Sequence, residues 1–301
     1  MSSPQAPPVI TDPPLPSTAG SISLACRGVN SGYRDRPVLH DVSFAIDRPA
    51  IYVVLGPNGA GKTTLFRTIA GILRPTSGEV FVRGAPIVHQ GSRDQMHYLS
   101  HMDGMPDGLT VREGLEFYAS IERATAADVD RVLDQLEIRP LADAYVSKLS
   151  AGQRKRVSIA RVFLVERSIY LLDEPTANLD PKVAREIRAL ILKLSQNRIV
   201  LYSSHNLFEA REIGEYVLAL KDGRLTLFDR MENLRGTHFI IGVRTLEPSA
   251  ALAQWERRGD YYLKEIPGPD QVPGLIQELE RQGVRIREVR EMENPLEELF
   301  T

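Results

Sequence analysis

The sequence predicts an α/β protein, in which amphipathic helices cover a sheet of short strands. Two patterns point to this class, because apolar runs of strand length alternate with segments whose apolar residues recur every three or four positions. The composition agrees, since 43% of the 301 residues are hydrophobic and 25% are charged, as in ordinary globular proteins. The formal net charge of -2 provides no bulk attraction to nucleic acid, so no nucleic-acid partner is expected.

Other classes are excluded by the same composition. No apolar run approaches the ~18 residues that a membrane-spanning helix needs, and the N-terminus lacks the pattern of a secretory signal. A single cysteine, Cys26, rules out an internal disulfide and a cysteine-rich metal site. Residues 1–20 hold six prolines and few large apolar side chains, which predicts a disordered or polyproline-like tail.

Residues 21–234 should form the main domain. Thr110 and Glu113, three positions apart, form a capping box that opens one of its helices. Asp222 and Gly223 lie between two apolar runs, which is typical of a hairpin turn. The predicted strands are 51–55, 168–172, 198–202, 216–220 and 225–228, and the other predicted helices include 62–73 and 128–136.

After about residue 234 the pattern changes. Residues 235–301 are predicted to be a small α+β domain with the order β-α-β-α-β. Strands and helices are expected in turn at 239–243, 250–258, 261–266, 272–282 and 284–289.

A complete G-x-x-x-x-G-K-[ST] motif lies between the predicted strand 51–55 and the helix 62–73. Glycines let the chain curl until several backbone N–H groups point at one polyphosphate, and the helix adds its positive N-terminal end. Lys62 supplies a charge for the β- and γ-phosphates, and the Thr63 hydroxyl can bind Mg²⁺. The residues predicted to hold the nucleotide are Gly56, Pro57, Asn58, Gly59, Ala60, Gly61, Lys62, Thr63 and Thr64.

An acidic pair follows the predicted strand 168–172. A carboxylate at the end of a buried strand is costly unless its charge is compensated, and Mg²⁺ would compensate Asp173. Glu174, the next residue, would then polarise an attacking water as a general base or a water-positioning group. The two motifs together predict a Mg²⁺-dependent NTPase.

A third segment narrows this class. It consists of Leu149, Ser150, Ala151, Gly152 and Gln153. These residues closely resemble the signature segment of ATP-binding cassette (ABC) ATPases. Phosphate loop, signature, acidic strand, Asp180 and His205 follow one another in the order of that family, over about residues 21–230. The resemblance implies an ABC-type P-loop fold with a RecA-like core, an antiparallel β subdomain and a helical subdomain at about 100–165. It also implies ATP and Mg²⁺ as cofactors.

The resemblance implies roles for residues around one bound ATP. Tyr33 occupies the place of an aromatic residue that stacks on adenine. His205 would contact the γ-phosphate and hold the attacking water together with Glu174. Lys62, Glu174 and His205 are therefore the expected catalytic residues, and Thr63 and Asp173 the expected Mg²⁺ ligands.

A second group of residues would act across a dimer interface. In the family, the signature residues contact ATP bound by the other subunit, which here implies Ser150, Gly152 and Gln153. The physical reason is that a helix N-terminus attracts anionic oxygens. ATP would thus lie between two copies of the chain in a homodimer, and Asp180 would serve communication across the interface.

One position departs from the family pattern. Where the family has a glutamine that couples Mg²⁺ binding to the transmembrane partner, this sequence has His101. A neutral imidazole can accept a hydrogen bond from a metal-bound water but is a poor direct ligand for Mg²⁺. We therefore expect the coupling and the hydrolysis rate to depart from the family pattern.

The resemblance implies a transporter ATPase that powers export through integral membrane subunits encoded separately. Such a chain, with one cassette and no membrane span, would lie peripherally on the cytoplasmic face of the cell membrane. Residues 293–300 resemble the ending of drug- and antibiotic-exporter ATPases. Two alternatives stay open, namely the ATPase of a haem- or cytochrome-biogenesis transporter and a soluble ABC ATPase without a membrane partner.

Overall fold

The computed structural model describes residues 22–34, 36–100, 104–234, 239–266 and 271–293. The predicted tail 1–20, His101 and nearly all of the C-terminal ending lie outside the described residues. The chain forms two compact units, which adjoin in sequence between Phe228 and Asp229. Within the described ranges, no helix is both long and apolar enough to cross a lipid bilayer.

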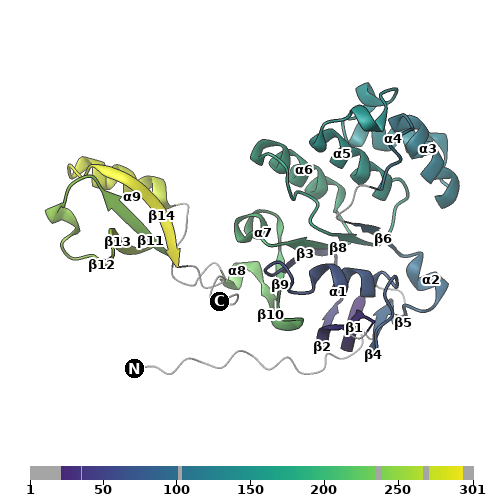
Figure 1. Cartoon of the computed structure of the whole chain (residues 1–301), viewed down its shortest axis with the longest axis horizontal. Coiled ribbons are helices and arrows are strands. Elements are labelled where there is room, and N and C mark those ends of the chain that lie inside the picture. The colour runs from purple at the N-terminus through teal and green to yellow at the C-terminus, as the bar shows by residue number, and fades with distance from the viewer. Residues whose placement is uncertain (1–21, 35, 101–103, 235–238, 267–270, 294–301) are drawn as a thin grey trace. The chain divides into compact units, whose positions relative to one another are not determined.

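A six-stranded sheet forms the centre of the larger unit (Figure 1). In spatial order its strands are β10 (Arg224–Arg230), β9 (Tyr216–Lys221), β3 (Ala50–Leu55), β8 (Ile199–Ser204), β7 (Ile169–Leu172) and β6 (Met96–Leu99). Strands β9, β3, β8, β7 and β6 are parallel, while β10 follows β9 after the turn at Asp222 and Gly223. Every residue of β3, β7 and β8 is buried, which explains why these strands read as uninterrupted apolar runs.

A second, antiparallel sheet lies on the other side of helix α1 (Lys62–Ile69) (Figure 1). Its strands in spatial order are β2 (Arg36–Ile46), β1 (Leu24–Tyr33), β4 (Ser77–Val82) and β5 (Ala85–Pro86), and the short α2 (Gln90–Arg93) follows. Leu65, Phe66 and Ile69 of α1 belong to one core with both sheets. The helix ends before the predicted residue 73, because Gly71 adopts a φ of +68° that breaks the helical path.

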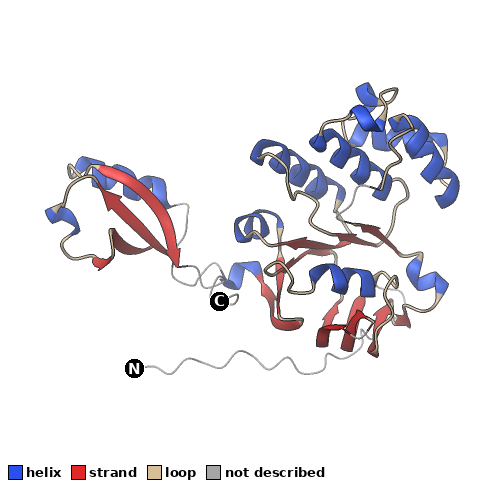
Figure 2. Ribbon diagram, in the orientation of Figure 1, coloured by secondary structure: helices blue, strands red, loops and turns tan. Residues whose placement is uncertain are grey.

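Apart from α1 and α2, the helices of the larger unit fall into two groups (Figure 2). One consists of α6 (Pro181–Leu194) and α7 (Leu207–Ile213), which lie across the central sheet from α1. The other is a helical subdomain of α3 (Val111–Glu122), α4 (Ala126–Gln135) and α5 (Ala151–Val162), with 3-10 turns at Arg139–Leu141 and Val146–Lys148. Each of these three helices begins with a complete capping box, formed by Thr110 and Glu113, Thr125 and Asp128, and Ser150 and Gln153.

The smaller unit corrects part of the prediction. After α8 (Met231–Leu234), an antiparallel sheet has the order β12 (Glu256–Arg258), β13 (Tyr261–Ile266), β11 (Phe239–Thr245) and β14 (Ile286–Glu293), with α9 (Val272–Arg281) before the last strand. The predicted helix 250–258 is wrong, since this range forms the 3-10 turn Ala250–Leu252 and then strand β12. The reason is a hairpin, in which Arg258 pairs with Tyr261 around Gly259 at a φ of +62°. The order is therefore β-β-β-α-β rather than β-α-β-α-β.

Candidate nucleotide site

The phosphate loop, residues 56–63, joins the end of β3 to the start of α1 as the sequence predicts. Gly59 and Gly61 have φ values of +86° and +102°, which L side chains rarely adopt. Gly56 is required for another reason, since a Cβ built there would lie 2.4 Å from the main-chain oxygen of Leu220. No side chain caps the N-terminus of α1, which leaves its first N–H groups for an anionic ligand.

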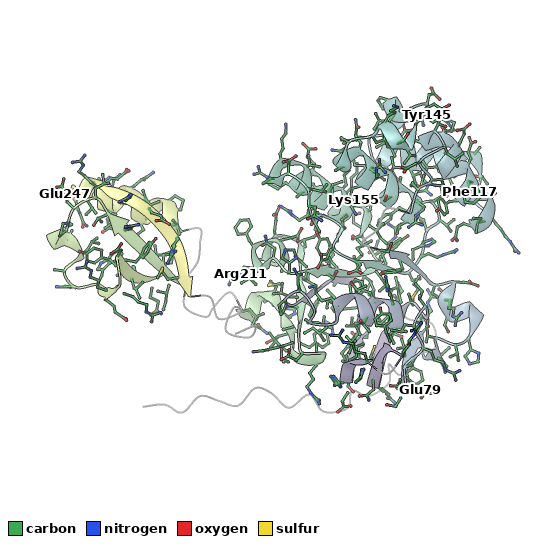
Figure 3. The ribbon with its side chains drawn as sticks, in the orientation of Figure 1. Glu79, Phe117, Tyr145, Lys155, Arg211 and Glu247 are labelled. Atoms are coloured by element: carbon green, nitrogen blue, oxygen red, sulfur yellow. The ribbon has the colours of Figure 1, made fainter. Side chains whose placement is uncertain are left out.

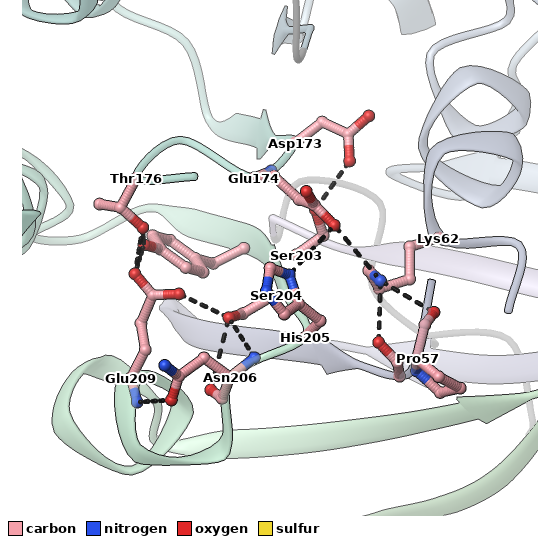
Figure 4. A network of polar contacts seen from close by, with 12 residues as sticks. Pro57, Lys62, Asp173, Glu174, Thr176, Ser203, Ser204, His205, Asn206 and Glu209 are labelled. Carbon is pink, nitrogen blue, oxygen red and sulfur yellow. Dashed lines mark hydrogen bonds and ion pairs between the residues drawn. The ribbon is translucent and has the colours of Figure 1, made fainter. Parts of the chain in front are cut away.

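The Lys62 ammonium is fixed at this loop. Its Nζ donates hydrogen bonds to the main-chain oxygens of Gly56 at 2.8 Å and Pro57 at 3.1 Å, and it lies 3.4 Å from Oε1 of Glu174 (Figure 4). The side chain is buried, with 5% of its surface exposed. A cation held this way costs little further ordering when an anion arrives, which is the property a phosphate site needs.

The loop borders an open hollow of about 540 Å³, which is large enough for a nucleotide. Two cations, Lys62 and Arg67, and one carboxylate, Glu174, face it together with the loop backbone. The lining residues are Val38, Asn58, Gly59, Gly61, Lys62, Thr63, Thr64, Arg67, Ser100 and Glu174. Three predicted loop residues, Gly56, Pro57 and Ala60, do not belong to this lining. Ala60 is buried, and its main-chain oxygen accepts a hydrogen bond from the N–H of Gly223, which fixes the loop on the side away from the hollow.

Asp173 lies at the end of β7 and is completely buried. Its carboxylate accepts hydrogen bonds from the Ser203 hydroxyl at 2.7 Å and the Tyr98 hydroxyl at 3.2 Å. Among the residues that the structure describes, no three His, Cys, Asp or Glu side chains gather as metal ligands. The donor set instead fits Mg²⁺, which needs one or two protein oxygens, such as Asp173 and Thr63, beside substrate phosphates.

Glu174 and His205 approach each other beside this carboxylate. His205 Nδ1 lies 3.7 Å from Glu174 Oε1, and the His205 side chain is half exposed (Figure 4). Ser203 ties the acidic pair together, because it accepts from the N–H of Glu174 at 2.8 Å while donating to Asp173. Glu174 has a φ of +46°, an uncommon conformation for a side-chain-bearing residue that can mark a functional site. This arrangement can orient a water molecule between a carboxylate and an imidazole.

Tyr33 is linked to Asp173 by hydrogen bonds through the side chains of Arg67 and Tyr98. Arg67 Nη1 donates to the Tyr33 hydroxyl at 3.0 Å, and hydrogen bonds to Tyr33 and Tyr98 raise the pKa of Arg67. Burial, with the charge of Asp173 as a second cause, raises the pKa of Tyr98 well above its ordinary value. The Tyr98 hydroxyl therefore stays protonated at neutral pH and donates to Asp173. Tyr33 itself keeps 42% of its surface exposed, as a stacking platform requires.

Removing the Tyr98 hydroxyl should weaken Mg²⁺ binding. In Tyr98→Phe one oxygen of Asp173 loses its donor, so we expect the Mg²⁺ concentration for half-maximal ATPase activity to rise about tenfold, as for other groups that orient a metal ligand. A Mg²⁺ titration at saturating ATP measures this. Tyr145→Phe, at an exposed tyrosine, is the control and should leave the titration unchanged. Identical titrations for both variants would contradict a metal-orienting role for Tyr98.

The predicted signature residues lie elsewhere on the chain. Ser150 caps α5, with its Oγ accepting from the N–H of Gln153 at 3.3 Å, and is exposed. Gly152 faces α6, where an added Cβ would lie 2.6 Å from Cγ1 of Val183. Asp180 is exposed at the N-cap of α6. In the described part of the chain, none of these four residues lines the hollow over the phosphate loop.

Three residues of the site were missed by the sequence reasoning: Arg67, Tyr98 and Ser203. Tyr98 and Ser203 sit at the carboxyl ends of β6 and β8, the two strands that flank β7. Polar residues at the same edge of neighbouring parallel strands are a signal that could have found them. No sequence pattern singles out Arg67, because it looks like an ordinary basic residue of an amphipathic helix.

Comparison with known proteins identifies the family. The model of the ABC transporter family matches residues 39–177. The energy-coupling factor transporter ATP-binding protein EcfA of Methanoculleus marisnigri is 36% identical over 213 residues, which cover 67% of this chain and 77% of EcfA. The uncharacterized ABC transporter ATP-binding protein YhcH of Bacillus subtilis is 28% identical over 291 residues, 92% of this chain and 94% of YhcH.

Similarity to a solved structure supports the same family. A dimeric ATP-binding cassette in a post-hydrolysis state, bound to ADP and Pi, matches with a TM-score of 0.63 and 25% identity over 69% of this chain and 98% of that one. Fold, phosphate loop and acidic strand thus define an ABC-type P-loop ATPase. The chain belongs to the ATP-binding proteins of ABC transporters, and it binds ATP with Mg²⁺ and hydrolyses it.

Further relatives act in both directions of transport. They include a sulfate/thiosulfate import protein of Synechococcus elongatus and a cytochrome c biogenesis export protein of Roseobacter denitrificans. The latter is 36% identical over 155 residues, 52% of this chain and 70% of that protein. Membership of the family therefore leaves the direction of transport open, but it favours a transport ATPase over a soluble ABC ATPase without a membrane partner.

Proposed function

We propose that this chain powers export of a substrate through separately encoded membrane subunits, as a homodimer that holds ATP between its two copies. The observation that carries the dimer is the separation of the two predicted half-sites. Lys62 and Glu174 line the hollow over the phosphate loop, whereas the exposed N-terminus of α5 at Ser150 does not. A second copy would bring that helix N-terminus to the γ-phosphate, and the related cassette in a post-hydrolysis state is dimeric.

In the proposed reaction, Lys62 and the N–H groups of the phosphate loop hold the β- and γ-phosphates, and Tyr33 stacks on adenine. Thr63 and Asp173 hold Mg²⁺, which when bound neutralises charge on the phosphate oxygens. Glu174 accepts a hydrogen bond from the attacking water and points it at the γ-phosphorus. His205, whose Nδ1 lies 3.7 Å from Glu174, contacts a γ-phosphate oxygen and limits the positions open to that water.

The proposed membrane contact is on the helical subdomain. Phe117 and Ile121, one turn apart on α3, expose 48% and 60% of their surface, and Tyr145 exposes 54%. Phe117 and Tyr145 are labelled in Figure 3. Large apolar side chains gathered on one subdomain are typical of a protein interface. Through this contact, closure of the ATP-bound dimer would move the membrane subunits, and hydrolysis would reset them. The chain would then lie on the cytoplasmic face of the membrane.

Copurification tests this proposal. Tagged chain purified from detergent-solubilised membranes should carry an integral membrane protein, and the double variant Phe117→Ser/Ile121→Ser should lose most of it. The matched control is Ile72→Ser, another exposed apolar residue with 65% of its surface exposed, which should keep the partner. Recovery of the chain without any membrane protein would contradict the transporter assignment. A solute-binding subunit in the complex would indicate import instead of export.

Export rather than import is supported by the ending 293–300, which resembles that of drug- and antibiotic-exporter ATPases. The second candidate is a cytochrome-biogenesis transporter, favoured by the 36% identity to the export protein of that process. That relative, however, matches only 52% of this chain, whereas YhcH matches 92% of it. Loss of c-type cytochromes after deletion of the gene would favour the second candidate.

A further inference from the structure

The loop that carries His205 is hydrogen-bonded to one residue of α7, Glu209, through its carboxylate and its N–H (Figure 4). Both neighbours of His205 are bonded to this residue. The Ser204 hydroxyl donates to the Glu209 carboxylate, and the N–H of Glu209 donates to the Asn206 side chain at 3.2 Å. The two neighbours are also joined to each other, since the N–H of Asn206 donates to Ser204 Oγ at 3.0 Å.

The same carboxylate reaches the acidic segment. The hydroxyls of Thr176, two residues after Glu174, and of Tyr202 on β8 both donate to Glu209 Oε1. Glu209 thus accepts hydrogen bonds from segments on either side of the gap between Glu174 and His205. A largely buried carboxylate, such as Glu209 with 12% of its side chain exposed, fixes the relative position of its several donors.

A buried arginine holds the carboxylate in place. Arg188 of α6, which is 7% exposed, lies 3.4 Å from Glu209 Oε1 and 2.6 Å from Glu212 Oε2. Because Asp180 is the N-cap of α6, this pair also joins the helix of the expected dimer interface to the His205 loop. Glu212 shares the arginine, and its side chain is 37% exposed.

We infer that Glu209 is a positioning residue for ATP hydrolysis, which sets His205 against Glu174. The inference rests on the catalytic role proposed for His205. The imidazole itself is half exposed, so its place is set mainly by its backbone, and the side chains of both neighbours, Ser204 and Asn206, are hydrogen-bonded to Glu209. A displacement of a catalytic group by about 1 Å can cost about 100-fold in rate.

The test compares Glu209→Gln, His205→Ala, their double variant and the control Glu212→Gln in the full-length protein. We expect Glu209→Gln to lower kcat about 10- to 100-fold while KM for ATP changes less than about twofold. In the His205→Ala background the same substitution should cause no further loss, because the residue to be positioned is gone. Glu212→Gln should keep the kcat of the unchanged protein.

Each failure has its own meaning. If His205→Ala leaves kcat unchanged, the role of His205 and this inference both fall. If His205→Ala lowers kcat but Glu209→Gln behaves like Glu212→Gln, or the two losses multiply in the double variant, only the positioning role is overturned. Should Glu209→Gln fold poorly, judged by its melting temperature, Ser204→Ala removes the link from Ser204 to the carboxylate, together with the bond from the Asn206 N–H, and should lower kcat in the same His205-dependent way.

Discussion

Glu174→Gln should lower the rate of ATP hydrolysis by about 100-fold or more while ATP still binds. The amide keeps the shape of the side chain but loses the negative charge that polarises water, and general-base groups typically contribute 10²- to 10⁴-fold. With hydrolysis blocked, ATP should hold two copies together. Phosphate release measures the rate, and size-exclusion chromatography with and without ATP measures the dimer.

The matched control for Glu174 is Glu166→Gln. Glu166 also forms an ion pair, with Arg198 at 3.0 Å, but 71% of its side chain is exposed. We expect this control to hydrolyse ATP at the unchanged rate and to remain monomeric after ATP is consumed. A Glu174→Gln variant with more than about a tenth of the normal rate would contradict the proposed role of the carboxylate.

Lys62→Met should weaken ATP binding about 100-fold. The substitution keeps an apolar stem in the buried space but removes a charge-assisted contact to the phosphates, worth about 1.5–3 kcal/mol for each hydrogen bond. It also leaves the oxygens of Gly56 and Pro57 without this donor and Glu174 without its cation 3.4 Å away. Equilibrium titration with a fluorescent ATP analogue gives the dissociation constant.

Lys193→Met provides the comparison for Lys62. Lys193 is exposed near the C-terminal end of α6 and takes no part in the described site. The dissociation constant of the Lys193→Met variant for the fluorescent ATP analogue should match that of the unchanged protein. If Lys62→Met also binds the analogue normally, the phosphates are held by the loop backbone and the α1 N-terminus alone, and the proposed role of the ammonium is wrong.

The strands of the central sheet and the phosphate loop could be predicted because their signals are local. β3, β7 and β8 are buried on both faces and read as apolar runs, and the loop glycines have no substitute at their φ values or contacts. The capping box of Thr110 and Glu113 is local in the same sense and is present as predicted.

Other features depend on contacts between distant segments and could not be read in this way. Residues 250–258 have a helix-like pattern because Leu252 and Trp255 both face the core, yet the hairpin with β13 decides their conformation. Tyr98 and Asp173 are 75 positions apart and meet only because β6 pairs with β7. The role of Glu209 could not be predicted from the sequence, because its partners Thr176 and Arg188 are distant along the chain and meet it only in the fold.

The three capping boxes of the helical subdomain make its response to acid uneven. Hydrogen bonds from the Thr110 and Thr125 backbones lower the pKa values of the Glu113 and Asp128 carboxylates. A folded-state pKa below the unfolded one means that each cap stabilises its helix above the unfolded pKa and loses that contribution as protons bind on acidification. Gln153 takes up no proton, so the start of α5, where Ser150 lies, is capped equally at every pH. Proton uptake would therefore loosen the starts of α3 and α4 while leaving the phosphate-facing helix of the proposed dimer unchanged.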